Sequence, residues 1–302
     1  MKPKLSIVIL SYNTKNLLRI CLRSVKKAQK NGLILQVIVV DNASSDGSPE
    51  MIKKEFSWVE LIVSKTNLGY AGGNNLGLKK VTGDYIIFLN SDVEIKNDGL
   101  TQVIEFMDRD KSIGAMTPRV DLYIGGMDPD CHRGFPTPWA SLTFFLGLEK
   151  IFPRSRIFGR YHLGYLNLNE PHEIDAGFGT FMIVRKIVID QVGNWDENYF
   201  FYGEDLDFFY RIKQSGWKVM FYPKVLSLHH KGASSGLRKE SKKVARADRE
   251  ITIKTAKSSI KAWEVFYKKF YKGKYNLLTT LIVLTGIRLK GFLRILKFVL
   301  SN

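Results

Sequence analysis

The sequence predicts an α/β fold in which helices flank a mixed, mainly parallel sheet, followed by a helical extension. Three observations support this prediction. Short apolar runs alternate with segments of helical periodicity over the first 230 residues. Several of the runs end abruptly in acidic or amide side chains. The chain beyond residue 235 is basic and compatible with helix. We therefore divide the chain into a domain at residues 1–235 and an extension at 236–302.

The strands of the expected sheet follow one another with a helix or a loop between them. The first helix carries an apolar stripe that includes Leu17, Cys21 and Val25. Alternation of this kind implies parallel neighbours, because a parallel pair needs a crossover connection. Strands are expected at residues 5–10, 36–41, 59–63, 85–89 and 113–120.

The overall composition is that of a globular protein. The chain has 302 residues, of which 45% are apolar and 25% charged, so it can bury a sizeable core. Cys21 and Cys131 are expected to be buried small side chains in a reducing compartment, since two cysteines make no disulfide framework. The apolar segment after Lys4 is too short for a signal peptide, which leads us to expect a cytoplasmic protein.

The positive charge is concentrated in the last quarter of the chain. The net charge is +17, yet residues 231–302 hold 18 Lys and Arg against 4 Asp and Glu. A nucleic-acid-binding protein would instead spread its charge over a folded face, so we expect no nucleic-acid partner. A nearly neutral enzyme with a basic, apolar tail is typical of proteins that dock on an anionic membrane surface.

Two of the expected strands end in carboxylates. Asp92 follows an apolar run long enough for a central strand, and Asp41 ends the second strand. Ligands of open α/β sheets bind beyond the carboxyl ends of strands, where a carboxylate can hold a divalent cation against a phosphate. From position alone, a turn at Asn90–Asp92 and a helix N-cap at Asp41 are equally good interpretations.

Three further stretches are candidate site segments. Residues 69–77 hold four glycines, which we expect to form a loop that admits a ligand, although the stretch is neither a dinucleotide fingerprint nor a P-loop. Glu204 and Asp205 fall in the first turn of an expected helix, where acidic residues often only complement the helix dipole. His229 and His230 follow a strand, and paired histidines are better metal candidates than a lone one.

Three motifs, in this order and spacing, resemble those of the family 2 glycosyltransferases with the GT-A fold. They are residues 40–48, 67–74 and 89–93, and the resemblance extends over roughly residues 4–235. Within the family, the sequence is similar to rhamnosyltransferase-like enzymes of bacterial surface polysaccharide assembly.

The resemblance implies a nucleotide-sugar site with a metal. Asp41 would accept a hydrogen bond from the pyrimidine ring, and Asp92 would bind Mg²⁺ or Mn²⁺ at the diphosphate. The family motif is often Asp-x-Asp, but this chain has Asn90 at the first position, which leaves room for a histidine ligand. We choose His229 over His230. The other implied donor-binding residues are Ser11, Asn13, Asn67, Gly69, Gly72, Asn74, Ser91 and Gly177.

The resemblance also implies an inverting reaction. Asp205 would act as the base that takes a proton from the acceptor hydroxyl as it attacks the anomeric carbon. Glu204 and Asp207 would bind or position the acceptor. Lys231, Ser234 and Ser235 are candidates to contact the diphosphate. We assign no chemistry to residues 121–172, which would either cover the sugar or receive the acceptor.

The implied function is transfer of rhamnose or another hexose from a dTDP or UDP donor to a polyprenyl-diphosphate-linked saccharide. A UDP-hexose transferase with a different acceptor is the alternative within enzymes, and a basic nucleic-acid-binding protein is the alternative from another class. The implied place of action is the cytoplasmic face of the inner membrane, with peripheral attachment. The sequence leaves a homo-oligomer open.

The extension is expected to form two helices, at about residues 239–272 and 276–300. The uninterrupted apolar segment at 277–287 is too short to span a bilayer, which needs roughly 20 apolar residues. Lys290, Arg294 and Lys297 fall on one side of the second helix, a pattern of anchors that lie in the membrane plane. Contact with a partner helix or a second copy is the alternative.

Overall fold

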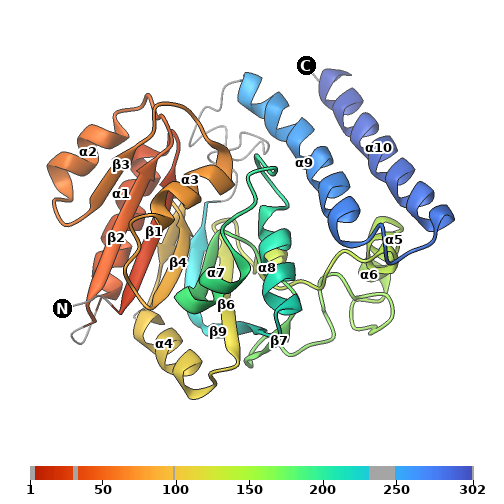
Figure 1. Ribbon diagram of the computed structural model, residues 1–302, viewed down its shortest axis with the longest axis horizontal. Helices are drawn as coiled ribbons and strands as arrows, with labels where there is room; N and C mark the ends of the chain where they lie inside the picture. The colour runs from red at the N-terminus through yellow and green to blue at the C-terminus, as the bar shows by residue number, and fades with distance from the viewer. Residues whose placement is uncertain (1–3, 30–32, 98, 231–248, 301–302) are drawn as a thin grey trace.

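The computed structural model describes residues 4–29, 33–97, 99–230 and 249–300 (Figure 1). Nine strands form one sheet in the order β3-β2-β1-β4-β8-β6-β9-β5, with β7 beside β9. The strands are β1 (Leu5–Ser11), β2 (Leu35–Asp41), β3 (Glu60–Val63), β4 (Tyr85–Asn90), β5 (Val93–Ile95), β6 (Ile113–Leu122), β7 (His172–Ile174), β8 (Phe181–Arg185) and β9 (Lys218–His229).

Helices lie along the sheet and beyond its edge (Figure 1). They are α1 (Lys15–Ala28), α2 (Ser48–Glu55), α3 (Gly69–Leu78), α4 (Gly99–Arg109), α5 (Pro138–Phe145), α6 (Leu148–Ile151), α7 (Lys186–Val192), α8 (Glu204–Gln214), α9 (Arg249–Phe270) and α10 (Leu277–Leu300), with a 3-10 turn η1 (Pro129–Cys131).

The predicted mixed, mainly parallel sheet is confirmed. Strands β3, β2, β1 and β4 run parallel, and β8 enters antiparallel between β4 and β6. The register pairs Ser11 with Asp41 and Leu10 with Asn90. The carboxyl ends of β2, β1 and β4 therefore meet at one edge of the sheet, which places the residues that follow them close together.

Apolar side chains bury both faces of the central strands. Ile7, Val8 and Phe88 are completely buried. On one face the Trp195 ring packs edge-on against Phe88 at 4.9 Å and stacks on Phe208 of α8 at 4.6 Å. Aromatic pairs at these separations add stability beyond the area they bury. The contacts fix α8, and with it the acidic residues of its first turn, against β4.

The glycine-rich stretch at residues 69–77 is helix α3, so the prediction of a loop there was wrong. The reason is close packing on the sheet. A Cβ atom at Gly73 would lie 2.3 Å from a methyl carbon of Leu10, and one at Gly77 would lie 2.5 Å from a methyl carbon of Val8. Gly73 and Gly77 thus allow the helix to approach β1 and β2, and that packing offsets the cost of these two glycines in a helix.

The extension forms an antiparallel pair of helices, α9 and α10, that packs beside α8 (Figure 1). An ion pair and ring contacts join α9 to α8. The Lys269 ammonium lies 2.6 Å from a carboxylate oxygen of Asp207, and the Phe266 ring packs on Tyr210. The start of the first predicted helix, residues 239–248, lies outside the described residues. Of the helices that are described, none is both long and apolar enough to cross a membrane. The boundary at residue 235 stays a prediction.

Candidate active site

A small cleft opens at the carboxyl ends of β1 and β4. Its volume is about 60 Å³, and its lining includes the predicted site residues Asn67, Gly69, Ser91 and Asp92. Gly69 has a φ of +74°, and a Cβ atom there would lie 2.4 Å from the Phe200 carbonyl oxygen, so a side chain is excluded. The remaining lining residues are Leu10, Tyr12, Asn42, Tyr70, Asn90, Phe200 and Phe201.

Asp41 is buried at the end of β2. One carboxylate oxygen accepts a hydrogen bond from the Ser44 backbone N–H at 2.9 Å, and the other has no hydrogen-bond partner within the described structure. Burial raises the pKa of Asp41, although its bonds to Ser44 oppose the shift. A buried acceptor without a partner is costly, and an N–H group of a bound ligand would satisfy it.

A network of polar side chains surrounds these strand ends. The Ser11 hydroxyl lies 3.1 Å from that of Thr14, which in turn lies 2.7 Å from the Ser91 hydroxyl. Asn13 accepts a bond from the Ser45 N–H at 2.8 Å. Asn67 accepts one from the Asn42 amide at 3.0 Å. The structure thus places Ser11, Asn13, Asn67 and Ser91 at one edge of the sheet, and their donor-binding role stays a prediction.

Three other predicted donor residues make packing contacts. The Asn74 amide is buried and donates to the Tyr70 carbonyl of its own helix at 3.0 Å. A Cβ atom at Gly177 would lie 2.2 Å from a methyl carbon of Thr117, and one at Gly72 would lie 3.0 Å from Leu68. These contacts explain the residue types without a ligand, so their donor-binding role stays a prediction.

Asp92 and His229 face each other inside the site. His229 Nε2 lies 3.4 Å from Asp92 Oδ1, and His229 Nδ1 lies 3.4 Å from a carboxylate oxygen of Asp128. Burial by itself would lower the pKa of His229, but the two carboxylates outweigh it and raise the pKa to about 9. His230 is oriented differently, since its ring stacks on Tyr123.

The donor set of this pair fits a divalent cation. Asp92 Oδ1 is buried and has no hydrogen-bond partner in the described part of the chain, and His229 Nε2 lies 3.4 Å from it. Mg²⁺ and Mn²⁺ are commonly held by few protein ligands together with water and phosphate oxygens. Among the described residues, no group of three or more His, Cys, Asp or Glu side chains could hold a metal ion.

Asp205 lies in the first turn of α8, as predicted. The helix begins after Gly203, whose φ of +85° suits glycine. Arg133 donates from Nη2 to Asp205 Oδ2 at 2.9 Å and to the Gly177 carbonyl oxygen. The Asp205 side chain keeps 14% of its surface exposed. It is therefore held by an ion pair but still reachable from solvent.

The charges of Asp92 and Asp205 both raise the pKa of Tyr70. Tyr70 of α3 is buried, and its pKa is raised well above the ordinary value by burial first, and then by the charges of Glu204, Asp205 and Asp92. Its hydroxyl donates to the Gly179 carbonyl at 2.6 Å. Tyr70 lines the same cleft as Asp92, and the charges of Asp92 and of the α8 carboxylates shift its pKa in the same direction.

The two other acidic residues of α8 differ in their surroundings. Glu204 is buried, and its pKa is raised well above the ordinary value by burial and by the adjacent Asp205. Asp207 is completely buried, and its carboxylate contacts Arg211 at 2.7 Å and Lys269 at 2.6 Å. These ion pairs give Asp207 a structural role between α8 and α9, and its predicted acceptor role remains untested.

Sequence reasoning missed two charged residues of this site, Arg133 and Asp128. Both lie in residues 121–172, to which no chemistry was assigned. Arg133 is 72 positions from Asp205, and Asp128 is 101 positions from His229. No local pattern marks either residue, because the contacts form only when η1 and its flanks fold over β6 and β9. Lys231, Ser234 and Ser235 lie outside the described residues.

Relatives of this chain include proteins named as rhamnosyltransferases. The N-acetylglucosaminyl-diphospho-decaprenol L-rhamnosyltransferase of Mycobacterium tuberculosis is 27% identical over 249 residues, covering 78% of this chain and 79% of that protein. Rhamnosyltransferase WbbL of Escherichia coli is 25% identical over 171 residues, covering 54% of this chain and 61% of that protein. The resemblance to rhamnosyltransferases is thereby confirmed.

Two solved structures share the fold. GalNAc-T7 with UDP, GalNAc and Mn²⁺ superposes with a TM-score of 0.58 at 18% identity, over 87% of this chain and 48% of that one. The mannosyltransferase PcManGT of Pyrobaculum calidifontis, in complex with GDP-Man and Mn²⁺, gives 0.54 at 15% identity, over 96% and 81%. The sequence profile described as Glycosyl transferase family 2 matches residues 6–193, and the chain belongs to that family.

Proposed function

We propose that the protein is an inverting glycosyltransferase that moves rhamnose, or a related hexose, from a dTDP or UDP donor to a polyprenyl-diphosphate-linked saccharide. The observation that carries the proposal is the cleft at the carboxyl ends of β1 and β4, which Asp92 lines and beside which Asp41 is buried at the end of β2. Asp205, in the first turn of α8, is the third carboxylate of the proposed site. The name of the mycobacterial relative, which specifies a lipid-diphosphate acceptor and a rhamnosyl group, supports the choice of substrates.

Each carboxylate has a separate task in the proposed reaction. Asp41 accepts a hydrogen bond from the nucleotide base through the oxygen that lacks a partner. Asp205 takes the proton of the acceptor hydroxyl while that oxygen attacks the anomeric carbon opposite the diphosphate, which inverts the configuration. Arg133 orients the Asp205 carboxylate through Nη2. A Mg²⁺ or Mn²⁺ ion bound by Asp92 and His229 would neutralise charge on the departing diphosphate.

The direct test is transfer by the purified full chain from a panel of nucleotide sugars. We expect dTDP-rhamnose with Mn²⁺ or Mg²⁺ to yield product on a polyprenyl-diphosphate N-acetylglucosamine acceptor, detected by mass spectrometry. Product from a UDP-hexose instead would favour the alternative donor. Absence of transfer from every donor, by protein shown to be folded, would contradict the proposal.

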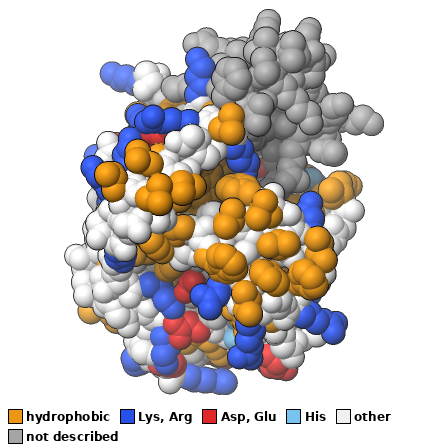
Figure 2. All heavy atoms as spheres, turned by 90° about the vertical axis from the view of Figure 1, so that its right-hand side faces the viewer, with side chains coloured by type: hydrophobic (Ala, Val, Ile, Leu, Met, Phe, Trp, Pro, Cys, Tyr) orange, Lys and Arg blue, Asp and Glu red, His pale blue; other side chains and the backbone are white. Residues whose placement is uncertain are grey.

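We also propose that the protein lies on the cytoplasmic face of the inner membrane through an apolar surface on α10. Leu278 and Leu281 of this helix are 68% and 55% exposed, and hydrophobic side chains gather on the face of the molecule shown in Figure 2. Exposed patches of this kind mark interaction sites. The side chains of Arg294 and Lys297 lie outside the described residues, so the predicted basic stripe stays a prediction.

Sedimentation with vesicles tests this location. Leu278→Asp combined with Leu281→Asp is expected to weaken binding to phosphatidylglycerol vesicles at least about tenfold, because each leucine contributes roughly 1.5–3 kcal/mol when buried. Ile187→Asp is the matched control, since Ile187 is an exposed apolar residue on α7, away from this surface. Equal sedimentation of the double variant and the control would count against the anchor. A change of mass on analytical ultracentrifugation would indicate a subunit contact instead.

A further inference from the structure

We propose that the apolar groove between α5, α9 and α10 binds the polyisoprenyl chain of the acceptor lipid. The inference rests on the proposed function and names the part of the protein that recognises the lipid. The groove is a separate cavity from the cleft at the strand ends, with a volume of about 580 Å³, within the usual range of small-molecule sites.

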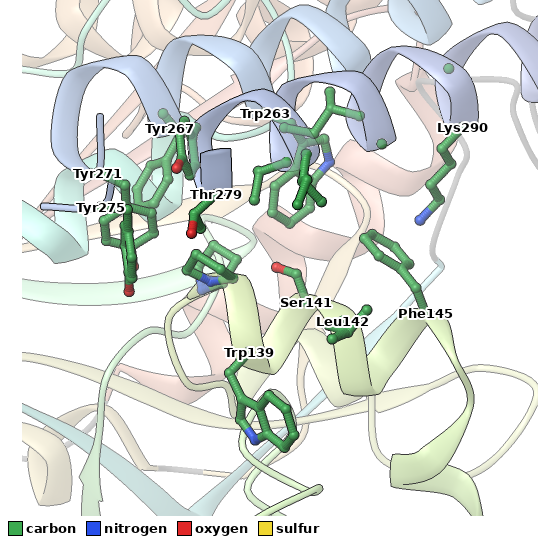
Figure 3. A pocket seen from close by; sticks show the side chains of 18 of the residues that line it. Trp139, Ser141, Leu142, Phe145, Trp263, Tyr267, Tyr271, Tyr275, Thr279 and Lys290 are labelled. Atoms are coloured by element: carbon green, nitrogen blue, oxygen red, sulfur yellow. The ribbon is translucent and has the colours of Figure 1, made fainter. Parts of the chain in front are cut away.

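The groove is lined mainly by aromatic and aliphatic side chains. Leu142 and Phe145 of α5 form one wall, and Trp263 and Tyr267 of α9 lie across from them (Figure 3). Gly286 of α10 leaves additional space, since a Cβ atom placed there meets no other atom within 4 Å. Such a lining suits a flexible hydrocarbon, because no polar group of the ligand has to be matched.

The groove opens onto the apolar surface of the molecule. Trp139, Leu142 and Phe145 are about half exposed, although they line a cavity. On α10, Ile282 both lines the groove and is exposed, and it directly follows Leu281, one of the leucines proposed to meet the membrane. The polyisoprenyl tail of a lipid that leaves the bilayer at this surface would therefore enter the groove without crossing water.

Residues that line the groove, or adjoin its lining, lie close to the proposed base, Asp205. Pro136, at one end of the lining, is three residues from Arg133, which holds Asp205, so their Cα atoms lie at most about 11 Å apart. On the other side, a Cβ atom at Gly203 would lie 2.9 Å from Cβ of Ala262 on α9. A lipid in the groove would thus have its head group near the first turn of α8.

The charges around the groove fit an anionic lipid. Lys290 places its ammonium 3.7 Å from the Phe145 ring centroid, and Lys274, in the turn between the helices, donates to the Tyr210 hydroxyl. A polyprenyl diphosphate combines an apolar chain with a negative head, which matches an apolar groove flanked by ammonium groups. A second copy is a poorer occupant, because residues 231–302 of both chains carry a large excess of Lys and Arg.

Photocrosslinking of the full chain tests the groove without any sugar transfer. The probe is farnesyl diphosphate with a diazirine on its terminal isoprene, in detergent. We expect labelled peptides from residues 136–145 and 260–291, with labelling suppressed by unlabelled farnesyl diphosphate but not by inorganic pyrophosphate. Gly286→Phe fills the groove and should reduce labelling about tenfold, the loss expected when roughly two methylene groups remain in water.

Gly273→Phe is the matched control, because Gly273 also has open space at its Cβ position but does not line the groove. It should label like the original chain. If Gly286→Phe fails to fold, Ser141→Phe fills the groove from α5, and the labelled peptides of the unaltered chain decide by themselves.

Three results would overturn the inference: labels confined to other peptides, equal competition by phosphatidylglycerol vesicles, or a dimer that Gly286→Phe dissociates. The proposed function would fail separately, through absence of transfer from every donor.

Discussion

Replacing Asp205 by Asn is expected to lower the turnover of sugar transfer by about 10²–10⁴-fold, the usual contribution of a general base. The amide has nearly the shape of the carboxylate, and its oxygen can still accept the bond from Arg133. It cannot take a proton from the acceptor hydroxyl. Turnover is measured with saturating donor, and donor affinity is measured separately by calorimetry, where we expect little change.

The control for this variant is Asp190→Asn. Asp190 is an exposed residue of α7 that pairs with Lys186 at 2.7 Å, so its loss removes a surface carboxylate of little energetic value. It should retain full activity. Loss of the fold or of donor binding in Asp205→Asn, seen by circular dichroism or calorimetry, would remove Asp205 from the base role.

Asp92→Asn should lower sugar transfer nearly as much as Asp205→Asn does, because it weakens metal binding and not proton transfer. A metal ion supplies several kcal/mol of charge stabilisation, so we expect transfer to fall by roughly 10²–10⁴-fold. Asp92 contributes the buried oxygen that faces His229 Nε2, and an amide there is a weaker ligand. Calorimetry with UDP or dTDP should show affinity that rises with Mn²⁺ in the original chain and no longer does so in the variant.

Glu94→Gln is the matched control for Asp92→Asn. Glu94 lies two positions further along and pairs with Lys96 at 2.8 Å near the surface. The affinity of Glu94→Gln for UDP or dTDP should rise with Mn²⁺ as much as that of the original chain does. Full activity of the unaltered protein in the presence of EDTA would contradict the metal assignment, whatever the variants show.

The parallel half of the fold was predictable because its signals are local. The run at Tyr85–Leu89 is apolar throughout and the run at Leu5–Leu10 is interrupted only by Ser6, as expected of strands buried on both faces, and both strands are found as predicted. The carboxylates that end β2 and follow β4 then come together by topology, since parallel neighbours end at one edge. The motifs indicated which residues at the strand ends are candidates for the site. The strand order explains why the ends of β2 and β4 lie at the same edge.

The remaining features depend on contacts that no window of sequence contains. Glycines usually argue against a helix. In α3 they are needed because Leu10 and Val8 on β1 leave no room for side chains where the helix packs on the sheet. Arg133 could not be assigned to Asp205 from its neighbours in sequence. In the sequence, Asp207 resembles Glu204 and Asp205. Only the position of α9 in the structure shows that the Asp207 carboxylate forms an ion pair with Lys269.

The salt link between α9 and the acidic helix makes the extension an integral part of the enzyme's architecture. Lys269 bridges two carboxylates, those of Asp196 and Asp207, at 2.6 Å each. A chain shortened before Lys269 would leave the buried Asp207 with only Arg211 for compensation, and removal of one partner of a buried ion pair is strongly destabilising. The sheet with its flanking helices and the α9–α10 pair are therefore best handled as one inseparable unit.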